Sequence, residues 1–179
     1  MPLFFTGSES DFSYIRIYQR LRDLDAMKPT ILEFVVTDQP TTADRDAILT
    51  PLRAFNVGQA GPSGFKELAI LLRDPSSSET VGGLSGKFLY DWLFIELMFV
   101  PQTVRGMGLG SQLLKRAEEI AIERGCVGVW LDTFGFQARG FYERNGYHVF
   151  GTLDEHPRGT QRFFLRKILN VGTTPTKQP

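Results

Sequence analysis

The amino-acid sequence predicts one domain of the mixed α/β class. Short runs of β-branched and aromatic residues alternate with runs whose apolar residues recur at helical spacing. The segment from residue 92 to residue 133 reads as strand, glycine-rich turn, helix and strand, which is a βαβ unit of ordinary length. A chain of 179 residues that is 42% hydrophobic is long enough to bury one core and too short for two ordinary domains.

Charge and cysteine content exclude several classes of function. Lys+Arg and Asp+Glu balance at 20 each, so no basic field predicts binding to nucleic acid or to an anionic membrane. No run approaches the roughly 18 apolar residues of a membrane span. The single Cys126 cannot form an internal disulfide, and with two histidines it gives no recognisable metal-ligand spacing. We therefore expect a cytoplasmic protein without a bound metal.

The N-terminal part is predicted to hold an extension and a first strand. Apolar residues recur at helical spacing from Ser8 to Ala26, so residues 1–28 are expected to form an extension with an amphipathic helix. Such a short helix needs to pack against the domain or a partner subunit. Thr30 to Val36 is rich in β-branched and aromatic residues and ends at a turn, which predicts a strand.

A helix follows this strand. Thr41 or Thr42, together with Asp44, is expected to begin it, and its apolar pattern runs towards Val57. Because proline lacks the N–H that a helix interior needs, Pro51 predicts either a kink or the start of a second helix.

Six later runs predict the remaining strands: Phe65 to Arg73, Thr80 to Tyr90, Trp92 to Val100, Val127 to Thr133, Tyr147 to Leu153 and Gln161 to Leu169. The first two are separated by a turn and are expected to form a hairpin. The run from Trp92 is apolar on both faces, which predicts a central strand buried on both sides. Glu96 within it would then be a buried carboxylate, which is costly unless it is paired, hydrogen-bonded or protonated.

Two further helices are predicted. The first follows the glycine-rich turn with one apolar face and ends at Arg124-Gly125. The second runs from Gln137 to Arg144 and ends at Asn145-Gly146. Residues 170–179, rich in Gly, Thr, Pro and Lys, are expected to be disordered.

The stretch from Val100 to Ser111 is a candidate anion-binding loop. Its glycines at 106, 108 and 110 leave the backbone accessible, Arg105 adds a positive charge, and the next helix begins with free N–H groups. The dinucleotide fingerprint fails because Ser111 stands where a glycine is needed, and no Gly-Lys-Ser or Gly-Lys-Thr follows as in nucleotide triphosphatases. A tight strand-to-helix turn without a ligand is the alternative.

The segment Arg105-Gly106-Met107-Gly108-Leu109-Gly110 resembles the coenzyme A pyrophosphate loop, Gln/Arg-x-x-Gly-x-Gly/Ala, of the GNAT superfamily of N-acetyltransferases. A second segment, from Phe134 to Tyr147, is similar to the later motif of that family, Asn/Gln-Ala-x-x-Phe-Tyr-x-x-x-Gly-Phe/Tyr. Two motifs in this order are more specific than either alone. The resemblance covers Thr30 to Leu169 and implies a single acyltransferase domain over residues 29–169. The implied fold is a mostly antiparallel sheet of six to seven strands, flanked by helices, with a splayed central strand pair.

The resemblance also implies the donor and its site. Acetyl-CoA or another acyl-CoA would be the acyl donor, and an amine the acceptor. The backbone of Met98, Phe99 and Val100 would pair with the pantetheine amides. The remaining residues expected to bind the donor are Arg105, Gly106, Met107, Gly108, Leu109, Gly110 and Ser111 around the pyrophosphate, and Gln137 and Phe141 in the second motif.

For the chemistry, the resemblance implies that Tyr142 is the general acid that protonates the departing thiolate. The alternative is that Tyr142 only packs beside Phe141. Glu96 is a candidate base, directly or through water, because an alternating strand would put it on the same face as Met98; a structural or substrate-binding carboxylate is the competing interpretation. Asp132, at the end of its strand, either caps the next turn or contacts substrate.

The function predicted from the sequence is therefore an N-acetyltransferase whose acceptor amine, in a small molecule or peptide, attacks the thioester directly. The alternative is a non-catalytic acyl-CoA-binding sensor or scaffold of the same fold. A homodimer through the N-terminal helix or the final strands is a further hypothesis. His156, in a polar loop, is a weaker candidate for the acceptor side, and His148 is expected on an outer strand face.

Overall fold

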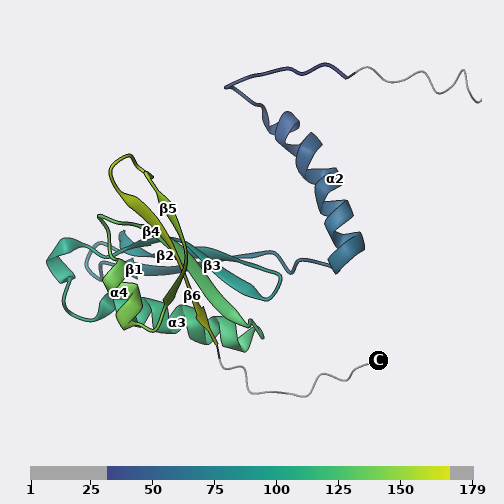
Figure 1. Cartoon of the computed structure of the whole chain (residues 1–179). Coiled ribbons are helices and arrows are strands. Elements are labelled where there is room, and N and C mark those ends of the chain that lie inside the picture. The colour runs from purple at the N-terminus through teal and green to yellow at the C-terminus, as the bar shows by residue number, and fades with distance from the viewer. Residues whose placement is uncertain (1–31, 170–179) are drawn as a thin grey trace, which may run out of the picture. The chain divides into compact units, whose positions relative to one another are not determined.

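The computed structural model describes residues 32–169 (Figure 1). The helix predicted for Ser8 to Ala26 and the tail over 170–179 lie outside these residues. The chain divides into two units at the boundary between Ile48 and Leu49. The elements are α2 (Thr42–Ala60), β1 (Lys66–Arg73), β2 (Thr80–Leu89), β3 (Trp92–Phe99), the 3-10 helix η1 (Gln102–Val104), α3 (Leu109–Glu123), β4 (Gly128–Phe134), α4 (Arg139–Arg144), β5 (His148–Asp154) and β6 (Gln161–Ile168).

The six strands form one sheet in the order β1-β2-β3-β4-β6-β5. Only β3 and β4 run parallel, and α3 connects them, so the predicted βαβ unit is confirmed. All other neighbours are antiparallel, which confirms the predicted mixed α/β fold with a mostly antiparallel sheet. Within residues 32–169, no helix has both the length and the apolar character needed to span a bilayer.

The parallel pair opens part of the way along its length. Cα pairing between β3 and β4 runs from Trp92 with Gly128 to Ile95 with Leu131 and ends there. β3 continues to Phe99, and β4 continues to Phe134, each still paired with its outer neighbour. The inner backbone edges of both strands therefore face a gap, as expected for a splayed central pair.

A β-bulge in β3 lies at the start of this gap. Gly86 of β2 pairs with Ile95, and the preceding Ser85 pairs with Leu97, so Glu96 is an extra residue. Ile95 is buried and Met98 packs against the core, whereas Glu96 and Leu97 between them are both exposed. The bulge therefore turns Glu96 to the face opposite Met98, and the expectation that the two share a face is wrong.

The core lies between the helices and one face of the sheet, and Figure 1 shows α3 and α4 on that same face. The buried side of α3 is formed by Leu113, Leu114, Ala117 and Ala121. The sheet supplies Leu93 and Ile95 from β3, Val129 and Leu131 from β4, and Leu165 from β6. On β3 only Leu93 and Ile95 are buried, whereas Trp92 and Phe94 on the other face are half-buried and Leu97 is 71% exposed, so the predicted burial on both faces is wrong.

The strand predicted for Thr30 to Val36 is not formed over residues 32–36, which the structure describes as irregular. The side chain of Phe34, for example, is 97% exposed. β-branched and aromatic residues favour a strand only where a neighbouring edge supplies hydrogen bonds and a packed face. No strand among the described residues pairs with this segment.

The helix α2 is continuous through Pro51, so the predicted start of a second helix there is wrong, and the kink stays a prediction. A proline costs an interior helix one hydrogen bond, and here the helix has full turns on both sides of that position. Its predicted beginning is confirmed by reciprocal bonds. The N–H of Asp44 donates to Oγ1 of Thr41 at 3.1 Å, and the N–H of Thr41 donates to Oδ2 of Asp44 at 2.8 Å.

The bulge leads to a stability prediction. A Cβ added at Gly86 would lie 2.2 Å from the carbonyl oxygen of Phe94, which belongs to the backbone of the neighbouring strand and cannot swing aside. We expect Gly86→Ala to lower the free energy of unfolding by about 2 kcal/mol or more, measured by urea denaturation.

Gly151→Ala is the matched control. Gly151 also lies beside a register shift, but an added Cβ there would meet only the side chain of Phe164, at 3.7 Å. We expect a change within about 0.5 kcal/mol. If both variants lost the same free energy of unfolding, the close approach of β2 to β3 would not be the reason that position 86 requires glycine.

Candidate active site

A cavity of about 840 Å³ lies in the gap between β3 and β4. Its walls come from the end of β3, the loop and first turn of α3, the end of β4, and α4 with the segment before it. All the predicted site residues except Met107 line it: Glu96, Met98, Phe99, Val100, Arg105, Gly106, Gly108, Leu109, Gly110, Ser111, Gln137, Phe141 and Tyr142. The two sequence motifs, about 30 residues apart, thus meet at one cavity.

The glycine-rich loop lines this cavity and contains a row of backbone N–H groups without acceptors among the described residues. Gly106 and Gly108 have φ values of 81° and 80°, a left-handed conformation that side chains with a Cβ rarely adopt. None of the N–H groups of residues 106–111 has a hydrogen-bond acceptor among residues 32–169, whereas the N–H of Gln112 donates to the carbonyl of Gly108. Gly108 begins α3 without a side-chain cap. Such a concave set of N–H groups at a helix N-terminus favours an anion.

The third glycine has a different role. An added Cβ at Gly110 would lie 3.0 Å from the ring of Phe141, so the first turn of α3 and α4 approach closely there. This contact connects the anion-binding loop to the helix that carries Tyr142. Glycine is therefore needed at position 110 for close packing of the two helices. The spacing of glycines in the sequence cannot distinguish this role from contact with a ligand.

Arg105 braces the loop against β3. Its Nε donates to the carbonyl oxygen of Val100 at 3.0 Å, and its guanidinium carbon lies 6.0 Å from the centre of the Phe99 ring. The two terminal nitrogens take no part in this bond. The side chain therefore holds the loop at the end of β3 and still brings a positive charge to the cavity.

Tyr142 extends from α4 towards β3. Its hydroxyl donates to Sδ of Met98 at 4.0 Å, and its ring packs edge-on against Phe141 at 5.1 Å between ring centres. Burial raises the pKa of Tyr142, and the negative charge of Asp132 raises it further. The phenol therefore stays protonated at neutral pH, in the form that donates a proton.

Glu96 is not the buried carboxylate that the sequence predicts. Its side chain is 38% exposed, and Oε1 lies 2.5 Å from Nζ of Lys87 on β2. Because Ile95 faces the core, strand alternation puts Glu96 on the opposite face, and the lysine supplies the countercharge. Glu96 still lines the cavity, from the face of the sheet opposite α3.

Asp132 pairs with Arg162, a residue that sequence reasoning missed. Nε and Nη2 of Arg162 lie 2.7 Å and 2.6 Å from Oδ2 of Asp132, whose side chain is 15% exposed. The partner is 30 residues away on β6, so no local pattern connects the two. The alternation of Arg162 and Arg166 with the apolar Phe163 and Leu165 is the signal that marks a polar face on β6.

Gln137 closes the end of β4. Its Oε1 accepts hydrogen bonds from the N–H of Phe134 at 2.9 Å and from Oγ1 of Thr133 at 3.1 Å. Capping of the turn after β4 is one of the two roles expected for Asp132. In the structure the side chain of Gln137 holds this turn instead. The same bonds orient the chain that leads into α4.

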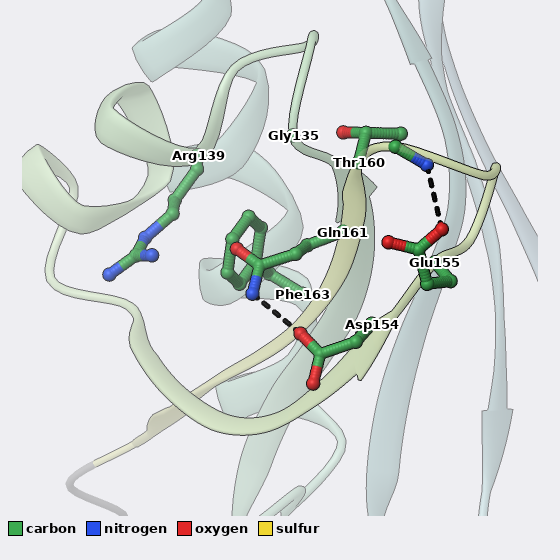
Figure 2. Close-up of a pocket in the computed structure, with 8 residues that line it drawn as sticks. Gly135, Arg139, Asp154, Glu155, Thr160, Gln161 and Phe163 are labelled. Atoms are coloured by element: carbon green, nitrogen blue, oxygen red, sulfur yellow. Dashed lines mark hydrogen bonds between the residues drawn. The ribbon is translucent and has the colours of Figure 1, made fainter.

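The histidines and a second hollow lie outside this cavity. His148 is exposed on β5, and His156 lies with Nε2 3.4 Å from Nη1 of Arg162. The second hollow, of about 640 Å³, lies between α4 and the β5–β6 hairpin (Figure 2). There Arg139 bonds Glu143, Asp154 accepts from Gln161, and Glu155 accepts from the N–H of Gly159. Each of these three charged groups thus already has a hydrogen bond within the chain. Among residues 32–169, no cluster of three or more metal-binding side chains occurs.

Comparison with known proteins agrees with this geometry. A model of the acetyltransferase (GNAT) family matches residues 56–147, which include both motifs. Acetyltransferase Atu2258 of Agrobacterium fabrum is 38% identical over 136 residues, which are 76% of this chain and 98% of that protein. Blasticidin-S acetyltransferase of Streptomyces morookaense is 36% identical over 132 residues, 73% of this chain and 95% of that protein.

The fold has a solved counterpart. The crystal structure of an acetyltransferase from Bacillus cereus ATCC 14579 superimposes with a TM-score of 0.68 at 30% sequence identity, covering 75% of this chain and 98% of that one. The matched family segment spans the cavity from the end of β3 through α4. Sequence, fold and cavity agree, and the chain belongs to the GNAT family of acetyltransferases.

Proposed function

We propose that the protein transfers the acetyl group of acetyl-CoA to an amine, with Tyr142 as the general acid. The observation that carries this proposal is that the row of free N–H groups at residues 106–111 and the protonated hydroxyl of Tyr142 line one cavity. The first is suited to a pyrophosphate and the second to a departing thiolate.

The donor would lie along the gap. Its pyrophosphate would accept hydrogen bonds from the loop N–H groups, with Arg105 adding charge. Its pantetheine amides would pair with the free inner edge of β3 at Met98 and Phe99, because that edge has lost its partner strand. The thioester would then lie near the point where the strands separate, beside Tyr142.

The chemistry follows from these positions. The amine nitrogen attacks the thioester carbon, the carbon–sulfur bond breaks, and the sulfur takes the hydroxyl proton of Tyr142. The proton that the amine loses passes to Glu96 or to water held by it, and exchange with solvent restores Tyr142. Glu96 lines the cavity on the face opposite α3, where an acceptor could approach without crossing the donor.

The acceptor class is an amine, and the first compound to test is blasticidin S, because a relative 36% identical to this chain is named as its acetyltransferase. Release of free thiol from acetyl-CoA with blasticidin S and a panel of amines tests the proposal. Binding of CoA by calorimetry without thiol release for any amine would favour a non-catalytic sensor or scaffold.

The loop predicts the effect of a single added methyl group. We expect Gly106→Ala to weaken CoA binding about tenfold or more, measured by calorimetry, because the left-handed φ at this position aims the N–H groups. Gly125→Ala is the matched control. Both glycines have positive φ, 81° and 75°, and an added Cβ meets nothing within 4 Å at either. Both variants should lose about 1–2 kcal/mol of stability, and only the first should lose affinity.

Tyr142→Phe should lower kcat about a hundredfold and leave CoA affinity unchanged, in single-turnover experiments where chemistry limits the rate. Tyr147→Phe is the control, because Tyr147 is a buried tyrosine that does not line the cavity. The pKa of Tyr142 is raised above its ordinary value of 10.0, so deprotonation of this group should not lower the rate below pH 10.0. Unchanged turnover in Tyr142→Phe would reject its role as the acid.

Glu96→Gln separates the roles of that carboxylate. If Glu96 is the base, the variant loses the acid limb of the pH–rate profile along with most of kcat. A raised KM for the amine with the acid limb kept would instead indicate substrate binding. Glu143→Gln, an exposed α4 carboxylate paired with Arg139, should behave as wild type.

A further inference from the structure

Asp132 lies where the gap begins. It directly follows Leu131, the last residue of β4 that pairs with β3. Val129, Leu131 and Thr133 are buried on the core side of β4, so the alternating Asp132 faces away from α3. The cavity is thus lined on the core side by Tyr142 and on the other side by Asp132. The charge of Asp132 nevertheless reaches Tyr142, whose pKa it raises.

The carboxylate of Asp132 is held by one oxygen only. Both contacts from Arg162 are to Oδ2, and among residues 32–169 no hydrogen bond reaches Oδ1. The side chain is only 15% exposed, and a charged hydrogen bond formed in such a partly buried position is stronger than one at the surface. Glu96, on the opposite side of the gap, is more than twice as exposed.

An aromatic surface lies next to Asp132. Trp130 is on the same face of β4 two residues earlier, and its ring stacks on Phe94 of β3 at 3.8 Å between centres and 12° between planes. Both rings are partly exposed. Aromatic faces favour both the alkyl part and the charge of an organic cation.

We propose that Oδ1 of Asp132 binds the acceptor as an ammonium ion, so that the acceptors are primary alkylamines that carry a charge at neutral pH. The bound ammonium gives one proton to solvent before its neutral nitrogen attacks the thioester. Arg162 is the positioning residue that fixes Oδ2, and the Trp130–Phe94 pair contacts the alkyl group. This inference rests on the proposed function in one respect, namely that the bound amine is the acceptor of the acetyl group. Binding of the cation itself can be tested without turnover.

The test uses n-butylammonium as the probe and the full chain loaded with CoA. The chain has two tryptophans, so the indole N–H signals of Trp92 and Trp130 can be assigned in NMR spectra with a Trp92→Phe variant. We expect butylammonium to shift the Trp130 signal saturably at millimolar concentration, and 1-butanol or added NaCl to leave it in place. Absence of this shift in the wild type would overturn the inference.

Asp132→Asn should weaken butylammonium binding about tenfold or more and leave CoA affinity unchanged. Asp154→Asn is the matched control, because its carboxylate ends β5, which β6 separates from β4, and does not line the cavity. Equal binding by the wild type and Asp132→Asn would overturn the proposal.

In Asp132→Asn the guanidinium of Arg162 loses its ion-pair partner, and this charge alone could repel the probe. A double variant removes that effect. Asp132→Asn/Arg162→Met leaves no unpaired charge, so it also serves if the single variant fails to fold. Persistent loss of binding in the double variant supports direct contact with Oδ1, whereas recovery would mean that Asp132 only neutralises Arg162. A wild type that binds butylammonium at Trp130 and releases no thiol with any amine would overturn the proposed transfer and not this site.

Discussion

The early end of the pairing between β3 and β4 is the constraint on which the site depends. Two parallel strands that stop exchanging hydrogen bonds after Ile95 and Leu131 leave backbone edges, and room between them, in the middle of a sheet. The glycine-rich loop lies at one end of this gap because β3 leads directly into it, and Tyr142 reaches the gap from α4. The cavity is a consequence of where the pairing stops and is not added to the surface by a separate insertion.

The glycines around the gap meet three different physical needs. Gly86 allows the backbone of β3 to bulge against β2, Gly106 and Gly108 turn N–H groups towards the cavity, and Gly110 lets α3 approach Phe141. A sequence pattern records only that glycine is present at these positions. The structure separates close approach between strands, a left-handed backbone and packing of two helices.

The order of elements from β1 onward and the position of the glycine-rich loop could be predicted because they depend on local periodicity and on short motifs. The bulge could not, since one extra residue in a strand leaves no mark in an apolar run, and it put Met98 on the core face, opposite Glu96. The partnership of Asp132 with Arg162 also depends on register between distant strands. Thr30 to Val36 failed as a strand over its described part because propensity supplies no neighbouring edge.

The beginning of α3 differs from that of α2. Because of this difference, an anion bound at the start of α3 would raise the stability of the folded protein. Thr41 and Asp44 satisfy the first N–H groups of α2 from within the chain, whereas α3 begins at Gly108 with no side chain to do so. An anion that occupies the loop therefore completes the helix as a cap from outside. By mass action, such a ligand at a hundred times its dissociation constant adds about 2.7 kcal/mol to the folded state. The lifetime of the folded chain in a cell would then rise and fall with the concentration of its donor.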